Sequence, residues 1–128
     1  MIGEADLRGH RILVVEDDYF LATDTARALQ RAGADILGPC PSEEAARAEM
    51  EQATPTAAVV DINLGDGPSF GLARILRARG TPFVFITGYD DEAIPAEFEG
   101  VARLQKPADY QQIVGSLARI LGATPRVG

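Results

Sequence analysis

The stretch AAVVDINLGDG, residues 57–67, places an apolar run of alanine and valine directly before the acid Asp61. A short apolar run that ends in turn-forming residues is typical of a strand buried on both faces of a parallel sheet. We therefore interpret residues 57–60 as a strand that carries Asp61 at its carboxyl end. Such an acid either marks the point where a buried strand meets water or takes part in chemistry, and the rest of the chain decides between these alternatives.

Units of apolar strand followed by helix extend from this stretch in both directions. Short apolar runs predict further strands at residues 11–15, 34–40, 82–87 and 101–105. Gly33 and Gly80 are predicted to end the first and third helices, and Ser42 is predicted to cap the second, at about 43–53. Residues 88–100 offer only a short helix interrupted by Pro95, and the last helix is predicted to open at Lys106 and Pro107.

Two helices show a clear apolar face. In the first, the residues predicted to face inward are Leu21, Thr25, Ala28, Leu29 and Ala32. In the last, they are Tyr110, Ile113, Val114, Leu117, Ile120 and Leu121. Alternation of strands and helices implies right-handed crossovers and a parallel sheet covered on both faces. The fold class is therefore α/β, with a doubly wound five-stranded sheet.

Length and composition limit the other possibilities. A chain of 128 residues suits one domain, which we place at 11–122 between an N-terminal flank, 1–10, and a frayed tail, 123–128. A net charge of −7 argues against direct binding of nucleic acid, and the apolar runs are too short for a membrane span or a secretory signal. The single cysteine, Cys40, is interpreted as a small apolar core residue, and a cytoplasmic location is expected.

The predicted strand ends carry polar side chains that a parallel sheet would bring to one edge. These side chains are Glu16 and Asp17 after the first strand, Asp61 after the third, Thr87 on the fourth and Lys106 after the fifth. Neighbouring carboxylates repel one another unless a cation offsets them, and Mg²⁺ prefers such oxygen ligands. With Mg²⁺ bound, one carboxylate could act as a nucleophile toward phosphorus, so the set suits transfer of a phosphoryl group to Asp.

Four motifs, ILVVEDD, VVDINLGDG, FITG and QKP, occur in this order at the predicted strand ends. Together they resemble the receiver domain of two-component response regulators, over residues 10–122, and FITG resembles a Phe-x-Thr-Gly subgroup of stand-alone receivers. The resemblance implies a flavodoxin-like strand order, 2-1-3-4-5. It implies Asp61 as phosphoacceptor, Thr87 as switch hydroxyl and Lys106 as the phosphoryl contact. The implied Mg²⁺ ligands are Glu16, Asp17, Asp61 and the backbone carbonyl of Asn63.

The same resemblance assigns a switch and output region. Pro107 matches the proline after the lysine, often preceded by a cis bond, and Gly88 matches a small residue that keeps the phosphoryl site accessible. Arg103 departs from the family pattern, because an aromatic residue usually stands three positions before the lysine. Tyr89 is our candidate for that aromatic role. The acid-rich segment 88–100 and the adjoining face of the last helix are the predicted output surface.

Several acids and the only histidine have simpler interpretations. Asp18 is predicted to cap the first helix rather than to reach a metal-bound water. Asp66 is interpreted as a turn residue before Pro68, and His10 as a solvated flank of the first strand rather than a phosphohistidine. A histidine-based relay would then use the histidine of a partner.

The resemblance implies a single-domain response regulator, not an enzyme acting on a separate metabolite. Its expected partners are a sensor histidine kinase or histidine phosphotransfer protein and a downstream protein target, with the chain monomeric or weakly dimeric. One alternative is a receiver-like scaffold that works without phosphorylation, although none of the acids, the threonine or the lysine is lost. A flavodoxin-like cofactor binder is the other, but acids follow the first strand where it would need a phosphate loop.

Overall fold

The computed structural model describes residues 6–64, 70–88 and 94–122. Its core is a five-stranded sheet with the order β2-β1-β3-β4-β5, in which every neighbouring pair is parallel. The strands are β1 (Arg11–Val15), β2 (Asp35–Cys40), β3 (Ala57–Asp61), β4 (Phe83–Thr87) and β5 (Arg103–Gln105). The predicted fold class and strand order are therefore confirmed. The tail 123–128 and most of the predicted flank, 1–5, lie outside the described residues.

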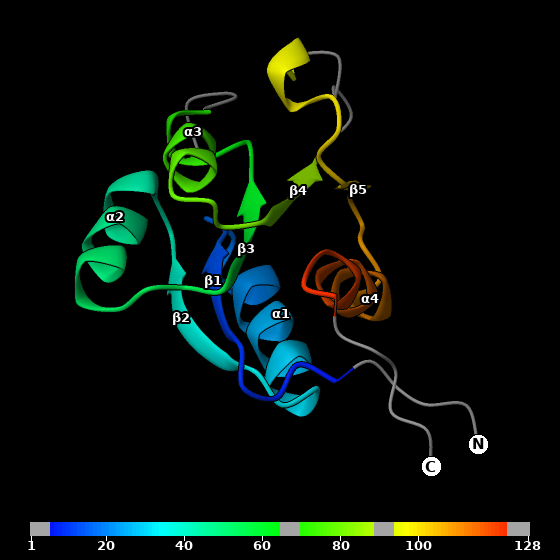
Figure 1. Cartoon of the computed structure of the whole chain (residues 1–128). Coiled ribbons are helices and arrows are strands. Elements are labelled where there is room, and N and C mark those ends of the chain that lie inside the picture. Colours follow the sequence, from blue (N-terminus) through cyan, green and yellow to red (C-terminus); the bar gives the residue numbers. More distant parts are fainter. Residues whose placement is uncertain (1–5, 65–69, 89–93, 123–128) are drawn as a thin grey trace.

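Helices cover both faces of the sheet (Figure 1). They are α1 (Tyr19–Arg31), α2 (Glu43–Gln52), α3 (Gly71–Ala78) and α4 (Tyr110–Ile120). The helices α1 and α4 lie on one face, and α2 and α3 lie on the other (Figure 1). In the part of the chain that the structure describes, no helix is both long and apolar enough to cross a membrane.

The central strand β3 shows why the sheet needs two helical layers. Successive side chains of a strand point to opposite faces, and all five residues of β3 are buried. Ala57 and Val59 pack into the cluster beneath α1 and α4, whereas Ala58 and Val60 pack into the cluster beneath α2 and α3. Burial on both faces explains the continuous apolar run that precedes Asp61.

The buried face of α1 differs from the predicted one. Ala22, Thr25, Ala26 and Leu29 are buried, whereas Leu21 is only half-buried, as is Ala28. The buried set has the spacing i, i+3, i+4, i+7, which turns a single stripe toward the sheet. The predicted stripe instead ran through Leu21 and Ala28, but the small side chains of Ala22 and Ala26 allow the helix to lie closer to the sheet.

The last helix begins later than predicted. It starts at Tyr110 rather than at Lys106 and Pro107, because the Asp109 carboxylate accepts a hydrogen bond from the backbone N–H of Gln111 at 2.8 Å and caps the helix there. The peptide bond before Pro107 is cis, as the family resemblance implied. Residues 106–109 thus form the loop that connects β5 to α4.

The connection between β4 and β5 is the least regular part of the described chain. Pro95 precedes a single 3-10 turn, η2 (Ala96–Phe98), which agrees with the prediction of only a short helix. The strand β5 is shorter than predicted, since Val101 donates a backbone hydrogen bond to Phe98 and belongs to the turn. Within the described part of this connection, Glu97 of η2 contacts Arg74 and Arg77 of α3.

Candidate functional site

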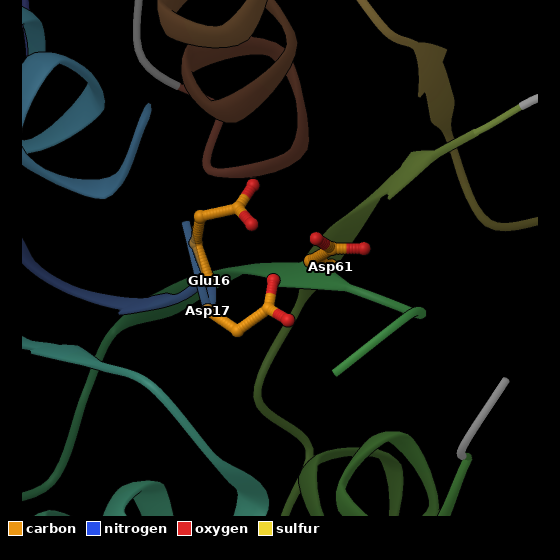
Figure 2. A group of neighbouring side chains, drawn as sticks. All are labelled: Glu16, Asp17 and Asp61. Atoms are coloured by element: carbon orange, nitrogen blue, oxygen red, sulfur yellow. The ribbon is translucent and has the colours of Figure 1, made fainter. Parts of the chain in front are cut away.

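Three carboxylates meet at the edge of the sheet where the parallel strands end. Glu16 and Asp17 follow β1, and Asp61 is the last residue of β3, so their side chains converge from neighbouring strands (Figure 2). One oxygen from each of the three lies within 4.8 Å of the others. Asp61 is only 1% exposed and Glu16 8%, whereas Asp17 is open to solvent. The predicted convergence of these acids is therefore present.

Lys106 brings a positive charge to the buried acids. Its Nζ lies 2.7 Å from Oδ2 of Asp61 and 3.4 Å from Oε1 of Glu16. The backbone N–H of Lys106 donates to the carbonyl of Thr87 at 2.8 Å, which continues the pairing of β5 with β4 past the end of the strand. The sheet thus fixes the backbone from which this lysine reaches Asp61.

Backbone donors orient the two buried acids. The N–H of Asn63 donates to Oδ1 of Asp61 at 2.8 Å, and the N–H of Asp18 donates to Oε2 of Glu16 at 3.2 Å. The carboxylate of Asp18 accepts from the N–H groups of Phe20 and Leu21 at 2.9 and 3.1 Å. Asp18 is therefore the cap of α1, as predicted.

The site is short of positive charge. Burial, followed by the hydrogen bond with Asp61, raises the pKa of Glu16 from 4.5 to about 8. Burial alone would lower the pKa of Lys106, but Asp61 and Glu16 together raise it, so the ammonium stays charged. One lysine thus faces three acids, and a divalent cation with oxygen ligands would offset the excess negative charge. Glu16, Asp17 and Asp61 are the residues that could hold it.

The remaining predicted residues lie beside this cluster. Thr87, which ends β4, is 1% exposed, and Gly88 follows it. A Cβ added at Gly88 would meet only the Asn63 side chain, at 3.8 Å, so glycine leaves this side of the site open. Asn63 therefore contacts Asp61 through its backbone and lies next to Gly88 through its side chain.

The structure describes Arg103, which stands where the family usually has an aromatic residue, but not Tyr89, our candidate for that role. Arg103, the first residue of β5, is half-buried, and its Nη2 lies 3.5 Å from the backbone oxygen of Glu99. It therefore contacts the β4–β5 connection rather than the acids. Tyr89 lies outside the described residues.

Sequence reasoning missed a cavity that adjoins the acids. It has a volume of about 350 Å³ and lies between α1, α4 and the sheet, with Glu16 and Lys106 on its polar side. Its apolar wall includes Leu21 of α1 and Ile113 of α4. Periodicity did not indicate this cavity, because the cavity depends on how deeply Leu21 packs against the sheet.

Two aromatic residues that follow the first acids in the sequence are exposed. Tyr19 is 75% exposed and Phe20 is 76% exposed, although an apolar pair in a helix is usually assigned to the core.

A search against curated proteins finds regulators of signal transduction. The sensory transduction protein LytT of Bacillus cereus is 32% identical to this chain in an alignment of 113 residues that covers 85% of the chain and 46% of LytT. The acid tolerance regulatory protein ActR of Sinorhizobium medicae is 30% identical in an alignment of 122 residues that covers 89% of the chain and 62% of ActR. The chain thus spans about half to three fifths of these relatives. No family model matches it.

A solved structure extends the likeness over a whole domain. The N-terminal domain of a response regulator/sensory box/GGDEF 3-domain protein from Carboxydothermus hydrogenoformans superposes with a TM-score of 0.73 at 26% identity. The alignment covers 88% of this chain and 94% of that domain. The shared strand order, the converging acids and the identity to curated regulators agree with one another. The chain belongs to the response regulator family and has the fold of its receiver domain.

Proposed function

We propose that this chain accepts a phosphoryl group on Asp61 from the phosphohistidine of a sensor histidine kinase or a histidine phosphotransfer protein. The observation that carries the proposal is the placement of the buried Asp61 carboxylate, 2.7 Å from the Lys106 ammonium and beside two further acids. Such an arrangement supplies a nucleophile, a cation for phosphoryl oxygens and a set of metal ligands in one place.

The transfer exchanges one bond to phosphorus for another. An Asp61 carboxylate oxygen forms the new P–O bond while the P–N bond of phosphohistidine breaks. The electron pair of that bond returns to the imidazole, which leaves as a neutral ring because its second nitrogen already carries a proton. The Asn63 N–H, 2.8 Å from Oδ1, holds the carboxylate in one orientation during this exchange.

Charge balance is the main task of the surrounding residues. We assign Lys106 to the phosphoryl oxygens, since its ammonium already contacts the nucleophile, and the Thr87 hydroxyl to a hydrogen bond with the same group. Glu16, Asp17, Asp61 and the backbone carbonyl of Asn63 would hold Mg²⁺, and the three carboxylates fit a hard cation by their donor type and mutual approach. When bound, Mg²⁺ would neutralise charge that develops on the phosphoryl oxygens.

Signalling would follow from the lifetime of the phosphorylated state. Gly88 leaves one side of the site open, so water could reach the phosphoryl group and hydrolyse it. The partner that responds would be another protein, because the net charge of −7 disfavours nucleic acid. A scaffold that works without phosphorylation is less favoured, since such a module would not need Lys106 fixed on a buried acid.

Intact-mass measurement with a small phosphodonor tests the proposal. With Mg²⁺ present, the wild type should gain one phosphoryl group, whereas Asp61→Asn should gain none. Chelation of divalent ions should slow the gain, as should Glu16→Gln, because both leave the phosphoryl charge uncompensated. The control Asp24→Asn, on α1 outside the acidic cluster, should be labelled like the wild type. Equal labelling of wild type and Asp61→Asn would contradict the proposal.

A further inference from the structure

Arg103 leaves this receiver fold without the aromatic residue expected on β5, but rings gather elsewhere. Phe70, Phe83, Phe85 and Phe98 form a cluster between the sheet and α3, which we call the ring cluster. Phe98 of η2 is fully buried, and its ring centroid lies 5.8 Å from that of Phe70 and 5.6 Å from that of Phe85. Aromatic pairs at these separations stabilise packing beyond the area that they bury.

The ring cluster connects three parts of the chain that matter for the site. Phe70 is the residue directly before α3. Phe85 lies on β4 two residues before Thr87, so both side chains point to the same face of the sheet. Phe98 belongs to the β4–β5 connection. The rings therefore link α3, and the strand that ends in the switch residue, to η2.

A second set of contacts fastens η2 to α3. Arg74 donates from Nε and Nη2 to Oε1 of Glu97, at 2.9 and 2.7 Å. Arg77 donates to the backbone oxygen of Glu97. The guanidinium carbons of the two arginines lie 5.9 and 5.1 Å from the centroid of the Phe98 ring, within the range of cation–π attraction. We call Arg74, Arg77 and Glu97 the arginine clamp.

We propose that α3 and η2 move as one unit, joined by the ring cluster and the arginine clamp, and that this unit transmits the phosphorylation state of Asp61 to the β4–β5 connection. The inference rests on the proposed function. A phosphoryl group on Asp61 adds negative charge beside β4, whose Ile86 pairs with Asp61. The same strand carries Phe85, which packs against Phe98. Close-packed contacts pass a shift of this strand on, because packed interiors have discrete arrangements rather than a continuous range.

The arginine clamp and the ring cluster can each be weakened by a separate substitution. Glu97→Ala removes the carboxylate that Arg74 binds, on the protein surface, without touching the site. Phe98→Leu keeps an apolar side chain in the core but removes the ring that both arginines and Phe70 contact. The matched control is Glu99→Ala, since the structure shows Glu99 contacted through its backbone oxygen by Arg103.

Amide NMR shifts on addition of Mg²⁺ and beryllofluoride, a phosphoryl mimic, decide the outcome. In the wild type, amides at 62–64 should report the mimic on Asp61, and amides at 94–102 should report the response of the connection. In Glu97→Ala and Phe98→Leu, the shifts at 62–64 should persist while those at 94–102 fall to about half or less, and Glu99→Ala should match the wild type.

Several results would overturn the inference. Unreduced shifts at 94–102 in Glu97→Ala would do so, and this surface variant decides the matter if Phe98→Leu fails to fold. Wild-type shifts at 62–64 without any at 94–102 would refute the inference but leave the proposed function intact. Absence of a response at 62–64 in the wild type would refute both.

Discussion

At the scale of single residues, Glu16 combines burial with a carboxylate neighbour. Because its pKa is raised to about 8, it holds a proton at neutral pH when no cation is bound, and Mg²⁺ must displace that proton. We therefore expect Mg²⁺ affinity to rise with pH up to about 8, by roughly tenfold for each pH unit below that value. Titration calorimetry in buffers of different ionisation enthalpy should detect release of a proton at pH 7.

The same shift has a defined effect on the stability of the metal-free protein. When the pKa of a carboxyl group is higher in the folded than in the unfolded state, the group's contribution to stability is fully present at pH values below the unfolded-state pKa. This contribution is lost as the pH rises through the folded-state pKa. The free energy of unfolding should thus decline between pH 4.5 and about 8. Glu16→Gln should remove this part of the decline in urea titrations. If Glu16→Gln still released a proton on binding Mg²⁺, and its free energy of unfolding still declined over the same pH range, the titrating group would be another residue.

Cys40 is a residue whose surroundings lower its reactivity. It is 2% exposed, and burial, followed by Glu49, raises the pKa of its thiol from 9.0 to about 11. Because the thiolate is the reactive form, the native protein should react with a chromogenic disulfide reagent at pH 8 at least about a hundredfold more slowly than the urea-unfolded chain. Cys40 is the only cysteine, so the absorbance trace has one source, and equal rates would show that β2 opens readily.

At the scale of elements, the start of α4 sets the loop that presents Lys106. The Asp109 carboxylate caps this helix, so Asp109→Ala should lower the free energy of unfolding by about 1 kcal/mol. Asp109→Asn, which keeps an acceptor oxygen, should lower it much less, since asparagine caps helices about as well as aspartate. Urea denaturation measures both, and equal losses would show that charge rather than the hydrogen bond is responsible.

Elements also show where sequence patterns stop being informative. The predicted strands at 11–15, 34–40, 57–60 and 82–87 agree with β1 to β4 within a residue, because short buried runs are bounded by polar turns. The buried face of α1 was predicted less well, since Leu21 was expected to lie inside and Ala26 was not. Which stripe of a helix is buried depends on how closely it approaches the sheet, and periodicity alone does not encode that distance.

At the scale of the whole molecule, topology explains why so much of the site could be predicted. Once the sheet is known to be parallel, every strand must end at the same edge, so Glu16, Asp17 and Asp61 have to converge. The pairing of Lys106 with Asp61 also follows from the order β3-β4-β5 together with the resemblance.

The ring cluster could not be foreseen in this way. Phe70, Phe85 and Phe98 belong to three different segments, and no local spacing relates them. Glu97 of the acid-rich segment 88–100 meets Arg74 from α3, and no pattern within that segment indicates this partner. Contacts between elements that have no common period become visible only in the folded molecule.

The central claim is that Asp61 itself carries the phosphoryl group. Borohydride reduces an aspartyl phosphate to homoserine, so treatment of protein labelled with a small phosphodonor and Mg²⁺ converts the acceptor into a stable marker, which peptide mass spectrometry can locate. We expect homoserine at position 61, none at Asp17 or any other aspartate, and no reduced side chain at Glu16. Homoserine at a different aspartate, or an unmodified position 61 in protein shown by intact mass to be labelled, would contradict the account.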